Sequence, residues 1–418
     1  MSSAAITDAA QVLRPPQDSL LFLRQNRAGE LSLEPGTVLI EGSQIAGLHD
    51  ASELGADITV DASGAAVIPG LVDCHTHLPF AGWREGEYAQ RVAGVAYEEI
   101  ARSGGGIRAS ARALREAGDA QVLAQAAELA GEMLAHGTTT FECKSGYGLS
   151  PEQELRALSL ARALDARVAQ ASTSTALLAH AVPDGYDADS WMDAVAEMMP
   201  SVISAGWVSA LDIYVESVAF DTGHLRRMGE LAAAHGLDLR AHVEQFSTMH
   251  SVPVAIAAGA RSVDHLAWLP LDEVGALAVA ETAAVLLPGA EFLGAEHTPP
   301  ARELADAGAI CVLGTDLNPG TSPVASLPLI IGLAVRRYGF SIREALLAAT
   351  LNAAWVLRDS MQTGSLEVGK RADVLVLDGP VERIPYRLGH NPVAVAFVGG
   401  RLAYVRPDCA WRVSGGHP

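Results

Sequence analysis

The chain has 418 residues, of which 49% are hydrophobic and 19% are charged, and its formal net charge is -20 at neutral pH. This length predicts either one large barrel with an accessory domain or two ordinary domains, and the composition excludes a miniprotein and a globally disordered chain. Because the many carboxylates repel phosphates and anionic lipids, we expect no nucleic-acid partner and no role at a membrane surface.

The cysteines and the amino terminus bear on the cellular location. The four cysteines are scattered and form no CxxC pair, which does not fit a disulfide scaffold: Cys74, Cys143, Cys311 and Cys409. The first residues lack a basic start followed by an apolar block, and no uninterrupted apolar run of about 18 residues occurs. We therefore expect a cytoplasmic protein without a membrane span.

The chain begins with a pattern of short strands, and this pattern changes near residue 66. Apolar runs between turn residues predict strands over 20–24, 37–42, 44–48 and 57–62. From about residue 66, continuous apolar runs alternate with Ala-rich helical stretches such as 119–137 and 222–236. These runs cover 65–73, 138–144, 211–217, 237–244, 260–266, 282–288 and 309–316. Buried parallel strands joined by helices predict a (β/α)₈ barrel of the TIM type.

The end of the chain returns to β-strands. A predicted helix over 342–357 is followed by strand patterns over 372–379, 394–400 and 401–407. The economical arrangement combines both chain ends in one small β-sandwich domain, made of 1–68 and 362–418. The barrel, 69–361, is then inserted between them.

The sequence His75-Thr76-His77 ends the first apolar run of the predicted barrel. Side chains two apart on a strand share a face, so both imidazoles are expected at the barrel mouth, where such barrels build their active sites. On its own this motif leaves two readings open, a metal site or two hydrogen-bonded polar residues at a strand end.

Three more polar residues follow later strands and favour the metal site. His242, His265 and Asp316 each come directly at or after the end of an apolar run. Three imidazoles and a carboxylate suit Zn²⁺ or Fe²⁺ and leave one coordination position for water.

Longer stretches carry a family resemblance. They include PGLVDCHTHLPFAGWREGEY, SGGGI, ECKSGYGLS, TDLNPGTSP and GSLEVGKRADVLVLD. Through them the chain resembles the metal-dependent amidohydrolase superfamily and, within it, the imidazolonepropionases. The resemblance implies His75, His77, His242 and Asp316 as metal ligands, His265 as an acid/base or carbonyl-polarising group, and a substrate pocket of Arg84, Tyr97, Tyr147, His180, Asn318, Gly320 and Thr321.

Residue chemistry agrees with part of this pocket. A propionate fits a guanidinium with two parallel donors, which Arg84 supplies just beyond the two histidines. A planar polar ring fits tyrosine walls and amide-matching donors. Isolated Arg and Tyr residues are usually surface or core filler, however, and the NPGTSP stretch is also explained as a turn that involves Asn318 and Thr321.

One position departs from the family pattern. Many imidazolonepropionases carry HADE after the fifth strand, and its final Glu handles a proton, whereas this chain has Gln245 at the aligned catalytic position. An amide cannot accept a proton, so the general base is expected to be Asp316 or His265. Glu244 takes this role only if the strand keeps its period of two through that residue.

The lysines bear on the number of metals. Binuclear relatives bridge two ions with a carboxylated lysine on a mid-barrel strand, but the only lysines here are Lys144, near the second barrel strand, and Lys370, near the carboxyl terminus. We therefore predict one divalent metal ion per chain, Zn or Fe.

The resemblance implies a reaction. It is hydrolysis of the cyclic amide of 4-imidazolone-5-propanoate to N-formimidoyl-L-glutamate in histidine degradation. In this reaction a metal-activated water attacks the ring carbonyl, which His265 polarises. Asp316 relays a proton to the departing ring nitrogen. The alternatives are another reaction of the superfamily, such as deamination of a purine- or pterin-like ring, and a scaffold protein without catalysis. We expect a small-molecule substrate and a homodimer.

Overall fold

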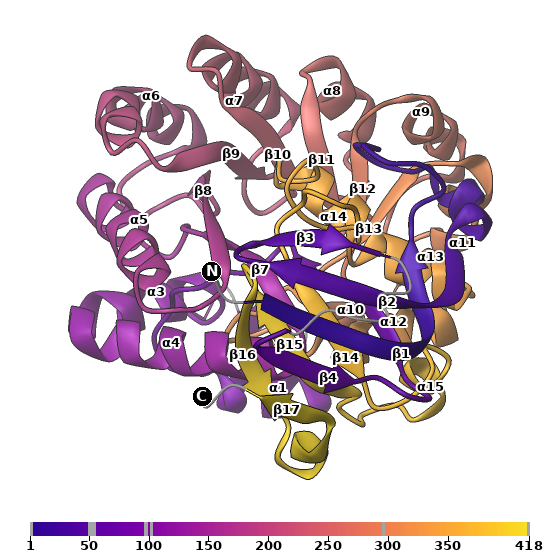
Figure 1. Cartoon of the computed structure of the whole chain (residues 1–418). Coiled ribbons are helices and arrows are strands. Elements are labelled where there is room, and N and C mark those ends of the chain that lie inside the picture. Colours follow the sequence, from indigo (N-terminus) through magenta and orange to yellow (C-terminus); the bar gives the residue numbers. More distant parts are fainter. Residues whose placement is uncertain (1–2, 49–55, 96–98, 101–102, 295–296, 416–418) are drawn as a thin grey trace.

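The computed structural model describes residues 3–48, 56–95, 99–100, 103–294 and 297–415. Two sheets organise the chain: a barrel of eight parallel strands, and a nine-stranded sheet built from both chain ends. In Figure 1 the indigo amino-terminal strands and the yellow carboxyl-terminal strands lie side by side, while the helices surround the barrel. The predicted (β/α)₈ barrel is confirmed, and both chain ends combine in a single nine-stranded sheet.

The barrel strands are neighbours in sequence order, so each unit adds one strand beside the last. Their bounds are β6 (Leu71–Asp73), β7 (Thr138–Lys144), β8 (Ala171–Ala179), β9 (Val208–Tyr214), β10 (Asp238–Val243), β11 (Ala260–His265), β12 (Ala283–Leu286) and β13 (Ile310–Leu313). Beyond β6 and β13, a parallel bridge joins Thr76 to Leu317. The first and last strands therefore meet at their carboxyl ends, where the barrel mouth lies.

Helices between the strands cover the barrel. They are α1 (Glu85–Val92), α3 (Ile107–Glu116), α4 (Asp119–Ala135), α5 (Pro151–Asp165), α6 (Ala188–Ser204), α7 (Thr222–Ala234), α8 (Val252–Ala257), α9 (Val274–Val279), α10 (Pro288–Phe292), α11 (Ala301–Ala307), α12 (Leu327–Arg337), α13 (Ile342–Ala348) and α14 (Leu351–Val356). Their apolar faces pack on the strands, for example α5 on β8 and α7 on β10. The predicted helix over 342–357 is divided into α13 and α14 at Ala349 and Thr350.

The nine-stranded sheet joins the two chain ends. Its strands are β1 (Ser3–Arg14), β2 (Ser32–Glu41), β3 (Gln44–Gly47), β4 (Ile58–Asp61), β5 (Ala66–Pro69), β14 (Val374–Leu377), β15 (Val393–Val398), β16 (Arg401–Val405) and β17 (Val413–Gly415). The long strand β1 pairs with β2, β4 and β5, and β5 pairs antiparallel with β14. A separate core that includes Ile6, Val38 and Phe397 fills this layer.

The apolar run over 65–73 is two strands rather than one. Residues 66–69 form β5 in the nine-stranded sheet, and 71–73 form β6 in the barrel. Gly70 lies between them, and a Cβ there would overlap the Thr139 side chain. The chain thus passes from one sheet to the other at a residue that only glycine suits.

The predicted strand over 20–24 is wrong. Its backbone pairs with a side chain instead of a strand, because the Asn352 amide accepts from Leu23 N (3.0 Å) and donates to Leu23 O (2.9 Å). Strands β1 and β8 were not predicted, since their Ala-, Ser- and Thr-rich sequences lack a continuous apolar run.

The longest described helices, α4 and α6, have 17 residues each. A helix needs about 20 predominantly apolar residues to cross a bilayer. Within the described part of the chain, no helix is long and apolar enough to do so.

Candidate active site

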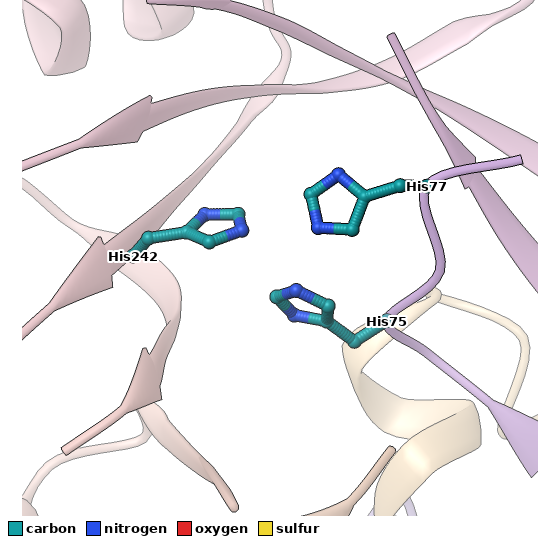
Figure 2. A group of neighbouring side chains, drawn as sticks. All are labelled: His75, His77 and His242. Carbon is teal, nitrogen blue, oxygen red and sulfur yellow. The ribbon is translucent and has the colours of Figure 1, made fainter. Parts of the chain in front are cut away.

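Histidines from two sides of the barrel converge at its mouth. Figure 2 shows His75 and His77, which follow β6, facing His242 of β10. The potential ligand atoms of these three residues all lie within 4.8 Å of one another, and those of His75, His265 and Asp316 form a second such group. The structure thus brings together every residue that the sequence proposed around the metal.

Carboxylates orient two of these imidazoles. Asp264 Oδ2 lies 2.6 Å from His75 Nδ1, and Asp212 Oδ1 lies 3.1 Å from His242 Nδ1. The Nε2 atoms of both histidines are buried and have no hydrogen-bond partner among the described residues. Metal-binding histidines use this arrangement, because a carboxylate on one ring nitrogen leaves the other free as a ligand. The site therefore fits a metal ion.

Asp316 completes the donor set. Its Oδ1 lies 3.2 Å from His77 Nε2 and 3.5 Å from His75 Nε2. Burial opposes ionisation of this carboxyl, but the nearby imidazoles of His75 and His77 hold its pKa well below the usual value. An ionised carboxylate among imidazole nitrogens is a donor set that Zn²⁺ and Fe²⁺ accept.

The backbone is strained where three barrel strands end. Glu244, His265, Leu266 and Asp316 have φ angles of 52°, 80°, 66° and 54°. Non-glycine residues in this left-handed region cost about 1–3 kcal/mol each and cluster at functional sites. Burial lowers the pKa of His265 to about 3, so its imidazole is neutral in the metal-free chain at neutral pH.

A cavity of about 400 Å³, measured with its open mouth, lies in front of the histidines. Its lining comprises His77, Arg84, Ile107, Tyr147, His180, Tyr214, His242, Gln245, Phe246, His265, Asp316, Asn318 and Thr321. Most of the predicted pocket residues are therefore brought together. Tyr97 lies outside the described residues. Tyr214, which the sequence analysis missed, ends β9 and carries the same signal as the histidines, a polar group at a strand end.

Arg84 is the cation of this cavity. Its side chain is 8% exposed, and its Nε lies 3.5 Å from Glu87 Oε2. The Nε and Nη1 atoms are buried and have no hydrogen-bond partner among the described residues. Gly320 makes room for the guanidinium, because a Cβ at that position would overlap it. Gly320 therefore shapes the pocket without being part of its lining.

The turn explanation of the NPGTSP stretch is also correct. Asn318 Oδ1 accepts from Gly320 N and Thr321 N, both at 2.8 Å. Asn318 Nδ2 donates to Asp316 O at 2.6 Å and to Thr321 Oγ1 at 2.8 Å. The Asn318 side chain thus shapes a loop that lines the cavity directly after Asp316.

Aromatic rings build another wall. The His180 ring stacks on His77, with centroids 5.3 Å apart and an interplanar angle of 16°. The ring of Tyr147 lies 5.4 Å from His180 and 5.8 Å from His77. His180 Nδ1 is 3.0 Å from Gly146 O, which fixes the ring orientation. This wall suits a flat ring lying against the histidine cluster.

Glu244 and Gln245 follow the end of β10 and point in different directions. Strand β10 ends at Val243, and Glu244 turns away from the cavity. Its carboxylate accepts from Met249 N and Ser251 N, both at 2.7 Å, and so ties down the following loop. The strand period does not continue, and Gln245 is the residue that lines the cavity.

A family model, "Amidohydrolase family", matches residues 66–403. Imidazolonepropionase from Rubrobacter xylanophilus is 43% identical over 91% of this chain and 94% of the relative. The same named enzyme from Herpetosiphon aurantiacus is 38% identical over 95% of this chain and 96% of the relative. The chain therefore belongs to the amidohydrolase family and, within it, to the imidazolonepropionases.

Solved structures agree on the fold. A zinc-bound adenosine deaminase from Xanthomonas campestris is 19% identical with a TM-score of 0.72, and the match covers 97% of this chain and 93% of that one. A triazine hydrolase variant is 18% identical with a TM-score of 0.74, over 96% and 94% of the two chains. At these identities the likeness supports the barrel fold and not a particular substrate.

Proposed function

We propose that this protein hydrolyses the cyclic amide of 4-imidazolone-5-propanoate and yields N-formimidoyl-L-glutamate, a step of histidine degradation. The relatives that cover most of the chain carry the name of this activity. The structural observation that carries the proposal is Arg84, a buried cation with unmatched donors in the same cavity as the histidine cluster. A propionate matches these donors in charge and in geometry.

The amidohydrolase family is metal-dependent, and we propose one Zn or Fe ion per chain. His75, His77, His242 and Asp316 would hold it. When bound, such an ion activates water and polarises a carbonyl.

The chain's own residues then have distinct tasks. Arg84 binds the propionate and orients the ring, and His265 donates a hydrogen bond to the ring carbonyl. Asp316 accepts a proton from the attacking water and passes it to the ring nitrogen as the carbonyl C–N bond breaks. Gln245 contacts the ring through its amide, which takes no part in the proton transfer.

The alternatives fit less well. A purine-like ring carries no carboxylate, so deamination of such a ring would leave the Arg84 donors unsatisfied, which is costly in a buried site. A scaffold that had lost catalysis would not need the complete ligand set, which is present here.

We also propose a homodimer in the cytoplasm. The scattered cysteines favour a reducing compartment, and all four are buried and unpaired. The net charge of -20 argues against binding to nucleic acid. Sedimentation equilibrium of the purified protein would test the dimer.

The activity test uses the purified, metal-loaded protein and freshly prepared imidazolone propanoate. We expect loss of the ring absorbance and formation of N-formimidoyl-L-glutamate, detected by mass spectrometry. Absence of turnover together with deamination of a purine or pterin would overturn the proposal.

A further inference from the structure

Below the metal-binding histidines lies a layer of buried charge. It consists of Glu142 and Lys144 on β7, Asp212 on β9, Arg240 on β10 and Asp264 on β11, each at most 1% exposed. Residues two apart on a strand share a face, so Arg240 lies one layer beneath His242. The barrel interior is therefore charged directly under the site.

Lys144 is at the centre of this layer. Its Nζ lies 2.7 Å from Asp212 Oδ2 and 3.0 Å from Glu142 Oε2. Asp264 Oδ2 is 3.9 Å away. Burial disfavours the ammonium charge, but these carboxylates outweigh the burial and raise the pKa of Lys144 above its usual value.

Two of the three carboxylates near Lys144, Asp212 and Asp264, are those that orient the histidines. Asp212 uses one oxygen for Lys144 and the other for His242 Nδ1. Asp264 Oδ2 lies between Lys144 and His75 Nδ1, and its other oxygen accepts from Ser262 Oγ at 2.7 Å. One ammonium group thus donates a hydrogen bond to Asp212 and lies at ion-pair distance from Asp264, and each of these carboxylates contacts one histidine.

Arg240 does not share this position. Its guanidinium pairs with Glu142 and donates to Val356 O at 2.8 Å and to Cys74 O at 3.4 Å. It therefore holds Glu142 and the backbone in place, whereas Lys144 lies beside the carboxylates that are hydrogen-bonded to the histidines.

We propose that Lys144 is the positioning residue of the metal centre, because its ammonium group fixes Asp212 and Asp264 and through them the imidazoles of His242 and His75. This inference rests on the proposed metal-dependent function. Groups that orient metal ligands typically account for about 10- to 100-fold in metal affinity.

A purely electrostatic role predicts the opposite effect. Together with Asp316, the carboxylates of this layer outnumber its two cations, Lys144 and Arg240, so the layer has an excess of negative charge that favours a cation. Replacing Lys144 by Met adds one more excess negative charge, and charge alone would then hold a cation more tightly. Weaker metal binding in Lys144→Met would show that loss of ligand orientation outweighs the added attraction.

The chain offers a matched control, because its only other lysine is also buried and paired. Lys370 Nζ lies 2.8 Å from Glu367 Oε1 and donates to Ser360 O at 2.6 Å, close to the nine-stranded sheet. Lys370→Met removes a buried lysine from an ion pair away from the metal centre. It therefore reports the general cost of such a change.

The experiment follows metal release to a chelator from wild type, Lys144→Met and Lys370→Met, each isolated with its metal, together with the visible spectrum of cobalt(II)-substituted protein. We expect release from Lys144→Met to be about 10- to 100-fold faster with an altered cobalt spectrum. Lys370→Met should match wild type in both measurements, even with a lowered melting temperature.

Release from Lys144→Met at or below the wild-type rate, or equal acceleration in Lys370→Met, would overturn the inference. If Lys144→Met does not fold, Lys144→Gln is measured instead, and wild-type release in that variant overturns the inference equally. A wild-type protein that retains metal but does not hydrolyse the imidazolone would refute the proposed function. The comparison of metal-release rates would still test the role of Lys144.

Discussion

Replacement of Arg84 tests the substrate assignment most directly. Breaking a desolvated, hydrogen-bonded charge pair costs about 2–5 kcal/mol. Since about 1.4 kcal/mol is a factor of ten, this corresponds to about 30- to 4,000-fold in kcat/KM. The Arg84 side chain is 8% exposed, so little water weakens its contact with a propionate, and the Glu87 carboxylate at 3.5 Å competes with that contact. We therefore expect Arg84→Ala to lose more than about 100-fold, within this range.

Related variants sharpen the test. Arg84→Lys should be intermediate, because an ammonium group keeps the charge without two parallel donors. Gly320→Ala should resemble Arg84→Ala, since its Cβ would displace the guanidinium. Arg108→Ala is the matched control, because Arg108 is half-exposed and faces Asp184 at 3.5 Å. It should stay close to wild type.

The assay compares kcat/KM for imidazolone propanoate with that for a ring analogue lacking the carboxylate. The analogue never uses the Arg84 contact, so its already low turnover should be nearly unchanged in Arg84→Ala. Equal damage to both substrates would show that Arg84 has a structural role and that another group binds the carboxylate.

Other predictions concern the metal and the proton transfer. Elemental analysis should find about one transition-metal ion per chain, and two tightly bound ions would contradict the single-metal proposal. His265→Asn should lower kcat steeply at near-normal metal content, whereas loss of metal would identify His265 as a ligand. Metal removal should speed hydrogen exchange at the backbone amides of His77 and Asp316 relative to amides of the nine-stranded sheet. Unchanged exchange would show that the hydrogen bonds that close the barrel do not depend on the metal.

The barrel and the cluster of histidines and Asp316 were predictable because both depend on local patterns. Apolar runs mark the strands, and a polar residue at the end of such a run marks the barrel mouth. His75, His242 and Asp316 all carry this signal. The same rule applied to the end of β9 would also have found Tyr214.

The layer beneath the site was not predictable in the same way. Asp212 and Asp264 lie within apolar runs, and their partners are 30 and 189 residues away in sequence. No local pattern reports which buried carboxylate faces which histidine, because strand register and barrel closure determine it. The direction of Glu244 was likewise hidden, since it depends on a φ angle of 52° at the strand end.

Barrel closure and the metal site share the same hydrogen bonds. Asp316 N donates to His75 O at 3.0 Å, and His77 N donates to Leu317 O at 2.9 Å. The segments that join the first strand to the last therefore carry three of the four proposed ligands. The left-handed backbone at Asp316 costs about 1–3 kcal/mol, and a ligand bound between these segments would offset that cost. The strain at the strand end is thus best understood as part of a centre that a bound metal ion would complete.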